Sequence, residues 1–432
     1  MTFHPLAQAL NHEFSSEGCS ILNMLSKQGK AIFFPSKGIL GQGAEAKNAP
    51  INATIGTALE DDGSPLTLTC VQDEIGTAKS SFLYAPSFGV EKLREVWKSQ
   101  ITKKNPSLQG KNFSLPVVTA ALTHGLSCAS YLFLDPEEEV IMPDLYWDNY
   151  ELIFECGRNA KISTFNTFNQ NSFDVVALKE AISNCKSSKK TVLLNFPNNP
   201  TGYTPTETEA KAIAQVLLEA AESGDQIVAL LDDAYFGLVY EEGVYTESLF
   251  SILADMHPNI LAVKLDGPTK EDYVWGFRVG FISFAFKGAT EAQLKALEAK
   301  SAGFIRANIS NAPNPSQQAL IEAYTCDQYL KQKEQKYTVL KNRYEEIKKE
   351  LKAKPHYQNA FAVMPFNSGY FMCVRPIGID AESIRKDLLK DYGTGVIVCS
   401  GLIRLAFSSV PIHQIPLLLE NIYNAIVKRQ NI

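Results

Sequence analysis

Residues 261–284, LAVKLDGPTKEDYVWGFRVGFISF, decide how the rest of the chain is interpreted. The stretch begins with an apolar run, LAVKL, that is typical of a buried β-strand, and then turns at small residues in 266–269. The turn delivers Lys270, and a second apolar run follows GFRVG at 276–280. A lysine at the end of a buried strand is costly unless its amine has a partner or a shifted pKa. Lys270 is therefore a candidate nucleophile, although on this stretch alone an exposed loop lysine is the commoner case.

The composition describes a globular protein with a large core. The chain has 432 residues, of which 45% are hydrophobic and 20% are charged, and this length allows a large domain with a smaller companion. A formal net charge of −6 gives no general attraction for nucleic acid or anionic membranes, and no apolar run reaches the length of a membrane span. We therefore expect neither a nucleic-acid partner nor a membrane partner.

The eight cysteines are scattered without the paired spacing of a disulfide framework or a zinc site. The opening segment, MTFHPLAQALNHEF, is interrupted by His, Pro and Asn, so it does not have the pattern of a signal peptide. We therefore expect reduced thiols, no metal site and a cytoplasmic location.

Apolar strand patterns alternate with amphipathic helix patterns over most of the chain. The runs at 140–147, 191–203 and 226–240 lack the polar alternation of half-exposed strands, and residues 206–209 form a T-x-x-E capping box for the next helix. This order predicts an α/β fold with a largely parallel sheet covered on both faces. The active site of such a fold is expected at the carboxyl ends of the strands.

Three regions are expected along the chain. Residues 1–65 are predicted to form an N-terminal arm that packs on another part of the protein, and part of a small domain. Residues 66–322, which contain these strand patterns, are predicted to form a large domain. Residues 323–432, which begin with a long charged helix, are predicted to form a small α/β domain whose face the N-terminal segment completes.

One predicted turn is suited to phosphate binding. Residues 115–133, LPVVTAALTHGLSCASYLF, are predicted to form a strand, a tight turn around Gly125 and a helix that starts near Leu126. Free backbone N–H groups at a helix N-terminus bind phosphate readily. Gly125, Leu126 and the hydroxyl of Ser127 are therefore candidate phosphate ligands.

The predicted strand ends carry a set of groups that one cofactor needs together. Lys270 supplies an amine, Asp232 a carboxylate and Tyr235 a phenol, while Asn199 supplies an amide and Arg278 follows the lysine by eight residues. Pyridoxal 5′-phosphate has an aldehyde that condenses with lysine, a ring nitrogen that a carboxylate stabilises, a phenolic oxygen and a phosphate. The combination predicts binding of this cofactor.

From about residue 52 to 407 the chain resembles the class I/II aminotransferases, which are pyridoxal-phosphate-dependent enzymes of fold type I. The matching residues, in chain order, are Tyr84-Ala85-Pro86 with Gly89, Asn199-Pro200-Thr201-Gly202, Asp232-Asp233-Ala234-Tyr235, Thr269-Lys270 with GFRVG at 276–280, and Ile403-Arg404-Leu405. The resemblance implies a large domain with a mostly parallel sheet of the seven-stranded type, a smaller α/β domain, and a homodimer with shared active sites.

The resemblance assigns roles around the cofactor ring. It implies that Lys270 forms the Schiff base and acts as the general base that moves the substrate Cα proton. Asp232 is expected to pair with the ring nitrogen, while Asn199 and Tyr235 bind the phenolic oxygen. Trp147 is expected to stack on the ring, and its alternative role is that of an aromatic filling the core.

At the phosphate end, Arg278 is expected to act as a bidentate clamp beside the helix N-terminus described above. Tyr84 resembles the tyrosine that reaches across the dimer interface to the phosphate of the other subunit. The sequence departs from the family pattern in having Leu126 in place of a glycine or serine, and Gly267 where a phosphate-binding serine is common. It also has Tyr150 where a histidine sometimes supports the aspartate.

Substrate binding is expected at Arg404, whose planar fork fits the α-carboxylate of an amino acid. Gly56 and Asn199 are expected beside that carboxylate. Arg306 resembles the arginine that a neighbouring subunit contributes to a second substrate carboxylate in dicarboxylate-specific members, and an exposed loop arginine is an equal alternative. These assignments favour acidic or aromatic substrates.

The resulting prediction is an aminotransferase that passes the amino group of an α-amino acid to a 2-oxo acid, with 2-oxoglutarate as the expected acceptor. A carbon–sulfur β-lyase, a decarboxylase or a cyclopropane-forming synthase of the same fold would share the lysine, aspartate and arginine. A non-catalytic sensor domain of a transcription regulator would need a basic helix-turn-helix extension, for which the segment before residue 52 is expected to leave no room.

Overall fold

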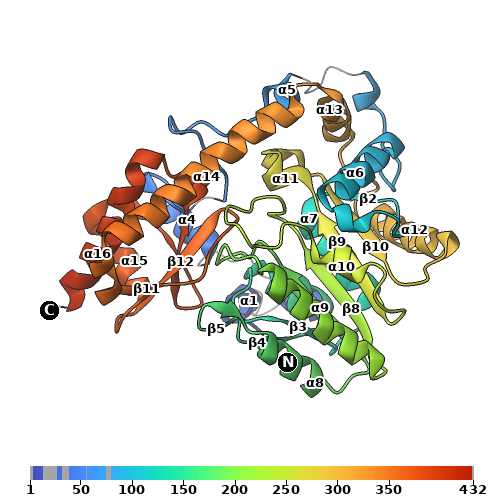
Figure 1. Ribbon diagram of the computed structural model, residues 1–432, viewed down its shortest axis with the longest axis horizontal. Helices are drawn as coiled ribbons and strands as arrows, with labels where there is room; N and C mark the ends of the chain where they lie inside the picture. The colour runs from blue at the N-terminus through green and yellow to red at the C-terminus, as the bar shows by residue number, and fades with distance from the viewer. Residues whose placement is uncertain (1–2, 13–26, 32–37, 55, 74–78, 431–432) are drawn as a thin grey trace.

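The computed structural model describes residues 3–12, 27–31, 38–54, 56–73 and 79–430. Four parts of the predicted N-terminal arm, residues 1–2, 13–26, 32–37 and 55, lie outside the described residues. Figure 1 shows a large sheet on one side of the molecule and a smaller sheet on the other, and the long helix α14 (Tyr329–Ala353) extends from beside α13 (Asn314–Thr325) across the smaller part.

A seven-stranded sheet in the order β2-β10-β9-β8-β7-β3-β4 forms the larger part. Only β10 is antiparallel to its neighbours, and the other strands run in one direction. The strand bounds are β2 Val117–Thr119, β3 Glu139–Pro143, β4 Lys161–Phe165, β7 Lys189–Asn195, β8 Gln226–Asp232, β9 Ile260–Asp266 and β10 Gly280–Ala285. The predicted sheet, mostly parallel and seven-stranded, is therefore confirmed.

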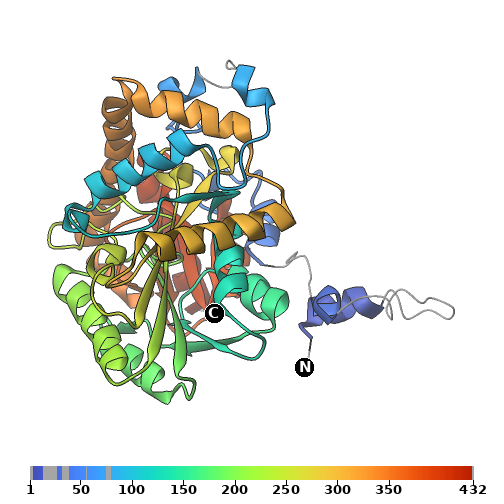
Figure 2. The same cartoon turned by 90° about the vertical axis from the view of Figure 1, so that its right-hand side faces the viewer.

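Helices cover both faces of this sheet, which explains why its strands lack polar alternation. In β8, Val228 and Leu230 face the core formed with α7 (Ala121–Phe133) and α12 (Glu291–Asn308), whereas Ala229 and Leu231 face the core formed with α9 (Glu207–Glu222). Figure 2 shows the strands between α9 and α7. The predicted capping box of α9 is present.

The smaller part is built on an antiparallel sheet with the strand order β11-β12-β15-β14. Its strands are β11 Phe361–Val363, β12 Phe371–Pro376, β14 Ile397–Cys399 and β15 Leu402–Ala406, and its helices include α15 Ala381–Tyr392 and α16 Ile415–Gln430. The N-terminal segment joins this part, because β1 (Ile51–Asn52) pairs in parallel with β13 (Thr394–Gly395). The Gln42 amide group also forms two hydrogen bonds with the backbone of Val398, at 2.6 and 3.0 Å. The domain boundaries at 65/66 and 322/323 stay predictions.

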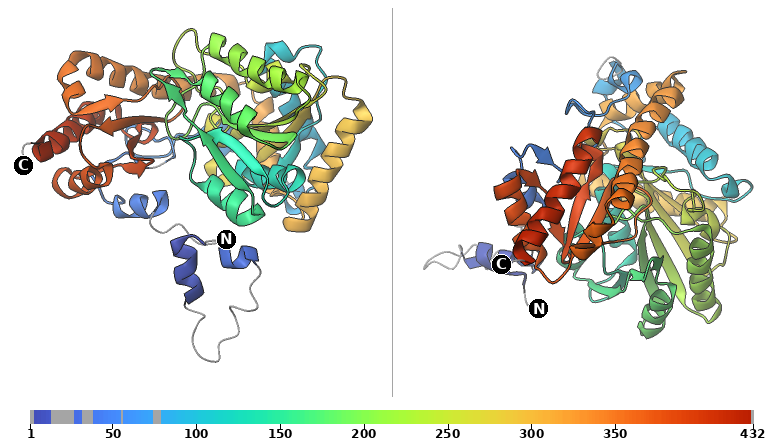
Figure 3. Two further views of the ribbon diagram at one scale, coloured as in Figure 1. Left: turned by 90° about the horizontal axis from the view of Figure 1, so that it is seen from below. Right: turned by 60° about the vertical axis from the view of Figure 1, so that its left-hand side comes forward.

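The remaining elements are short helices, strands and connections. They include α1 Pro5–His12, α3 Lys27–Ala31, α4 Ile39–Glu45, α5 Thr69–Gln72, α6 Glu91–Lys104, α8 Val175–Asn184, α10 Leu249–Leu253, α11 Pro268–Glu271, α13 Asn314–Thr325, the π-helix η3 Glu151–Cys156, β5 Phe168–Asn169 and β6 Ser172–Phe173. The left view of Figure 3 shows α1 and α3 projecting from the side of the body. Within the described residues, no helix has both the length and the apolar character needed to cross a membrane.

Candidate active site

A pocket with a cavity volume of about 200 Å³ lies where β7, β8 and β9 end. The residues predicted from the sequence that line it are Lys270, Asp232, Tyr235, Asn199, Trp147, Arg278, Arg404 and Gly56. The predicted site residues that do not line it are Gly125, Leu126, Ser127, Tyr84 and Arg306.

Lys270 lies on α11, the short helix that follows β9. Its Nζ is 5.2 Å from the centroid of the Tyr235 ring, and its backbone carbonyl accepts a 2.8 Å hydrogen bond from Tyr370 Oη. Burial lowers the pKa of the Lys270 amine to about 8, an effect that Asp232 opposes and Arg278 assists. The amine is therefore suited to act as a nucleophile or base close to neutral pH.

Asp232 is the last residue of β8, and its side chain is buried. Its Oδ2 accepts a 2.6 Å hydrogen bond from Tyr150 Oη, and its Oδ1 accepts a 3.1 Å bond from the Ala234 N–H. Burial raises the pKa of Asp232 to about 6, while both hydrogen bonds act to lower it. Tyr150 thus supports Asp232 from the sequence position at which the family sometimes has a histidine.

Aromatic and amide side chains form the walls between these groups. Trp147 is half-buried in the pocket wall, with its ring 5.6 Å from the Tyr150 ring in an edge-on arrangement. Tyr235 is buried, and burial raises the pKa of its hydroxyl. The Asn199 N–H donates a 2.8 Å hydrogen bond to Asn195 Oδ1, which holds the Pro/Asn-rich turn after β7 in place.

Arg404 enters the pocket from β15, in the smaller part of the molecule. It is only 3% exposed and its guanidinium lies 4.3 Å from the centroid of the Phe371 ring. Its two hydrogen bonds go to neutral oxygens, Asn199 Oδ1 at 3.0 Å and the Thr54 carbonyl at 3.3 Å. Its Nε has no partner among the described residues. A buried guanidinium in this state is suited to a carboxylate ligand.

The helix at the phosphate end starts earlier than predicted. α7 begins at Ala121, and the predicted start near Leu126 is wrong. Ala121 has a φ of 64°, so the chain turns directly after β2 at a residue that carries no glycine signal. Gly125 serves close packing instead of a turn, because a Cβ there would lie 3.0 Å from Leu265 Cδ2. Leu126 is buried in the core, and Ser127 is half-buried in the second turn of the helix.

The groups that line the pocket at the start of α7 therefore differ from those predicted to bind phosphate. Ala121, Leu122 and Thr123 line it at the start of α7, where backbone N–H groups have no intrahelical acceptor. Thr269 also lines the pocket, and its buried Oγ1 has no hydrogen-bond partner among the described residues. Among these residues, only Thr269 could be singled out from the sequence, because it precedes Lys270 in the Thr-Lys pair.

Gly267 cannot be replaced by the serine that is common in the family. A Cβ at this position would lie 2.9 Å from Gly280 Cα and 3.0 Å from the Val279 carbonyl oxygen. Because both contacts are with backbone atoms, a side chain does not fit without moving β10. The glycine is required by the close approach of these two segments.

Tyr84 and Arg306 lie away from the pocket of their own chain. Tyr84 is 91% exposed, and its neighbours Phe82 and Leu83 are also exposed. Arg306 is an exposed residue near the end of α12, where its Nη1 donates a 2.8 Å hydrogen bond to Ser310 Oγ. Any contribution of these two side chains to a pocket has to be made to another subunit.

Comparison with known proteins gives consistent results along the chain. The family model for aminotransferase class I and II matches residues 50–422. A probable N-acetyl-LL-diaminopimelate aminotransferase of Bacillus subtilis (strain 168) is 28% identical over 338 residues, which cover 75% of this chain and 77% of that protein. An aspartate aminotransferase of Geobacillus stearothermophilus is 28% identical over 204 residues, covering 46% and 47% of the two chains.

Solved structures have the same fold. The crystal structure of an aminotransferase from Anaerococcus prevotii DSM 20548 superimposes with a TM-score of 0.82 at 24% identity. The superposition covers 93% of this chain and 99% of that one. At this level of identity the likeness concerns the fold, and the names of the relatives show that several substrates occur among similar chains.

Proposed function

This chain belongs to the aminotransferase class I and II family, and from that premise we propose which of its side chains bind the cofactor and substrate and move the proton. It is a pyridoxal-phosphate-dependent enzyme that transfers the amino group of an α-amino acid to a 2-oxo acid. The observation that supports the proposed roles is that one pocket contains the amine of Lys270, the carboxylate of Asp232 and the guanidinium of Arg404.

The chemistry of the pocket fits pyridoxal 5′-phosphate. When bound, the cofactor supplies an aldehyde for an amine and a ring that withdraws electrons from the substrate Cα. The first turn of α7 and the unpartnered Thr269 hydroxyl offer donors to its phosphate. Arg278 also lines this end, which suits a bidentate contact with phosphate oxygens. In this proposal the backbone of Ala121–Thr123 replaces the turn at residues 125–127.

Lys270 and Asp232 carry out the proton chemistry. Lys270 would hold the cofactor through its amine, and the free Nζ would take the proton from the substrate Cα as a general base. Asp232 stays ionised and holds a proton on the ring nitrogen, with Tyr150 orienting the carboxylate. Tyr235 and Asn199 bind the phenolic oxygen, and Trp147 lies against the ring; their positions in the pocket wall support these roles.

Arg404 binds the α-carboxylate of the substrate. The guanidinium is held by Asn199 and by the Thr54 backbone, and Phe371 packs on its face, so its orientation is set before the substrate arrives. Gly56 lines the same end of the pocket, where the lack of a side chain leaves room for the carboxylate. The carboxylate replaces the missing charged partner of the buried arginine.

A homodimer with shared active sites completes this proposal. The exposed apolar residues Phe82 and Leu83, next to Tyr84, support a contact with a second copy. Tyr84 would reach the partner's phosphate, and Arg306 would meet a second substrate carboxylate, which favours acidic or aromatic donors with 2-oxoglutarate as acceptor. We place the enzyme in the cytoplasm, a proposal supported by the free cysteines among the described residues.

A half-reaction screen tests the proposed function. The purified holoenzyme is mixed with one amino acid at a time, without an acceptor, and the cofactor absorption and the released 2-oxo acid are followed. The productive donor converts the cofactor stoichiometrically to pyridoxamine phosphate, and added 2-oxoglutarate converts it back. Continuous release of pyruvate and ammonia, or of carbon dioxide, without an acceptor would identify a lyase or a decarboxylase and contradict the proposal.

A further inference from the structure

A group of buried charged side chains lies outside the catalytic pocket and takes no part in the proposed mechanism. Lys264, in β9, is fully buried, and its ammonium forms an ion pair with Asp233. It also lies 3.4 Å from Asp266 Oδ2. Asp233 Oδ2 accepts a 2.6 Å hydrogen bond from Ser248 Oγ, and Asp266 Oδ1 accepts a 3.0 Å bond from Trp97 Nε1. Burying three charged groups is costly, so their retention next to an active site calls for an explanation.

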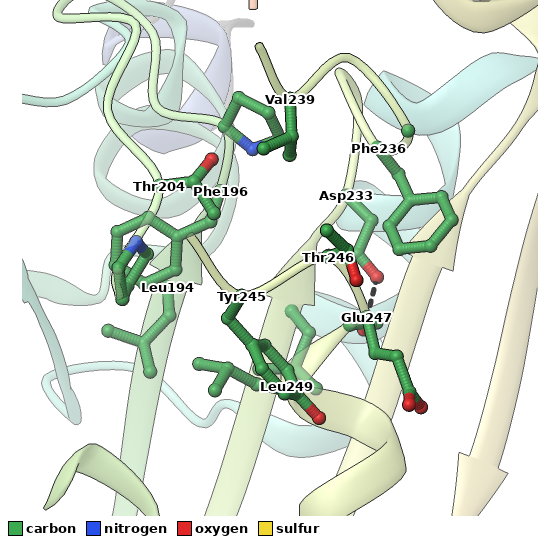
Figure 4. A pocket seen from close by; sticks show the side chains of 15 residues that line it. Leu194, Phe196, Thr204, Asp233, Phe236, Val239, Tyr245, Thr246, Glu247 and Leu249 are labelled. Carbon is green, nitrogen blue, oxygen red and sulfur yellow. Dashed lines mark hydrogen bonds between the residues drawn. The ribbon is translucent and has the colours of Figure 1, made fainter. Parts of the chain in front are cut away.

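The group is connected to the catalytic aspartate through the backbone of β8. Asp232 ends the strand and Asp233 follows it, and successive residues point to opposite faces of a sheet. Asp232 lines the catalytic pocket, whereas Asp233 lines a second pocket, shown in Figure 4, that shares no lining residue with the first. Figure 4 shows Asp233 and the hydrogen bond it accepts in this second pocket.

Adjacent carboxylates affect each other's ionisation. The charge of Asp233 acts to raise the pKa of Asp232, in addition to the larger effect of burial. Other charged or titratable groups near the two aspartates and Lys264 are Tyr150, Tyr235 and Lys270 on the catalytic side, and Asp266, Glu271, Lys104 and Tyr245 on the opposite side. Lys104 is paired with Glu271, which leaves Lys264 as the cation in direct contact with Asp233.

We propose that Lys264 is a positioning residue that neutralises Asp233 and thereby keeps Asp232 negatively charged for the ring nitrogen of the cofactor. The proposal rests on the role proposed above for Asp232. Lys264 touches neither cofactor nor substrate in this arrangement, since it lies on the opposite face of the sheet. Without its ammonium, the negative charge beside Asp232 is uncompensated, and Asp232 takes up a proton at higher pH.

The test compares the pH dependence of cofactor binding in matched variants. The net charge of Lys264, Asp233 and Asp266 is −1 in the wild type, −2 in Lys264→Met, 0 in Asp233→Asn, and −1 in the double variant. The apparent dissociation constant of pyridoxal 5′-phosphate is measured by absorbance between pH 5 and 9. We expect binding to weaken as pH falls through the pKa of Asp232, which is about 6 in the wild type.

Opposite shifts are expected from the two single substitutions. In Lys264→Met the curve moves up by about one pH unit, so binding at pH 6 weakens by about fivefold, because the ionised fraction of Asp232 falls from about one half to about one tenth. In Asp233→Asn the binding curve moves to lower pH, and in the double variant the curve returns to the wild-type position. The control is Lys190→Met, which removes another buried lysine that is paired with Asp225 at the opposite end of the sheet. This control is expected to lose stability and to keep the wild-type curve.

The possible outcomes separate this inference from the proposed function. If wild-type protein fails to bind the cofactor, the proposed function falls. If the wild type binds with the expected pH dependence while Lys264→Met and Asp233→Asn both keep the wild-type curve, only the role of Lys264 is overturned. If Lys264→Met does not fold, the other two variants test the role of Lys264. A shift to lower pH in Asp233→Asn, with the double variant at the wild-type position, supports this role, and any other result overturns it.

Discussion

Single side chains around Asp232 set the balance between its charged and neutral forms. Burial favours the neutral acid, and the hydrogen bond from Tyr150 favours the carboxylate. A catalytic carboxylate with a pKa of about 6 is sensitive to the loss of one such bond. Substitution of a single residue that contacts Asp232 should therefore change the pH dependence of the enzyme directly.

Tyr150→Phe should raise the pKa of Asp232, because it removes the hydroxyl that donates to the carboxylate. Asp232 is then protonated at higher pH, so the acidic limb of the kcat/KM profile should move up by about one pH unit. The matched control is Tyr146→Phe, which removes a neighbouring hydroxyl that bonds to Glu151 instead. Identical pH profiles for both variants and the wild type would contradict the role of Tyr150.

Arg404→Lys should weaken substrate binding while preserving the positive charge. Lysine loses the bidentate fork and the contact with Phe371, so we expect KM for the amino acid to rise by about 10- to 100-fold, or about 1.4 to 2.7 kcal/mol. The control is Arg375→Lys, on the neighbouring strand β12 and exposed. An unchanged KM in Arg404→Lys would argue that another group binds the carboxylate.

Sequence reasoning worked best for residues whose chemistry is tied to a motif. Lys270, Asp232 and Arg404 each follow or lie on a recognisable strand, and all three line the pocket. The prediction of a turn at Gly125 was wrong because a glycine needed for packing against Leu265 cannot be told from a turn glycine in the sequence. That distinction depends on contacts made by β9, which local sequence does not encode.

At the scale of elements, the turn that carries Lys270 is fixed to two helices by buried ion pairs. Glu271 pairs with Lys104 of α6 at 2.7 Å and with Lys333 of α14 at 2.5 Å, and Asp272 also pairs with Lys333 at 2.8 Å. α14 continues from Lys333 to its contacts with α16 in the smaller part, so these pairs connect the catalytic turn to both parts of the molecule. The apolar patterns predicted the helices and strands, whereas these long-range pairs were not detectable from sequence.

Glu271→Gln should lower the free energy of unfolding by about 3 kcal/mol, since it leaves Lys104 without its buried partner and Lys333 with Asp272 alone. Burial acts to raise the pKa of Glu271, but the two lysines outweigh it and hold the pKa at about 2. This value lies below the ordinary value of about 4.3. The stabilisation is therefore complete above about pH 4.3 and is lost as pH falls toward 2.

Chemical denaturation of both proteins at several pH values measures this effect. The difference between wild type and Glu271→Gln should be largest at neutral pH and should shrink below about pH 4. Glu346→Gln is the control, because its partner Lys349 is an exposed neighbour on the same helix. A pH-independent difference, or an equal loss in the control, would show that the ion pairs do not stabilise the turn.

At the scale of the whole molecule, the exposed apolar residues after the short helix at 79–82 point to a second subunit. Leu83→Asp should shift the protein toward monomers and weaken cofactor binding, because the partner's Tyr84 no longer reaches the phosphate. Light scattering after size-exclusion chromatography measures the mass. Leu417→Asp, which changes an exposed leucine of α16, is the control and should stay dimeric.

A monomeric wild-type protein that binds the cofactor fully would contradict this shared-site arrangement. The sequence alone favoured a dimer only through Tyr84 and Arg306, whose roles depend on another subunit. The fold within one chain was more predictable, since apolar runs and helix caps act over short distances. β1 pairs with β13, more than 300 residues away in the sequence. The sequence pattern suggested that the N-terminal segment completes the small domain, but it did not identify this strand pairing.

The central claim is that Lys270 is the residue that binds the cofactor covalently. Holoenzyme is reduced with sodium borohydride, digested and analysed by mass spectrometry to locate the pyridoxyl group. The account predicts the label on Lys270, and no label in Lys270→Ala treated in the same way. A label on another lysine, or equal labelling of wild type and Lys270→Ala, would contradict it.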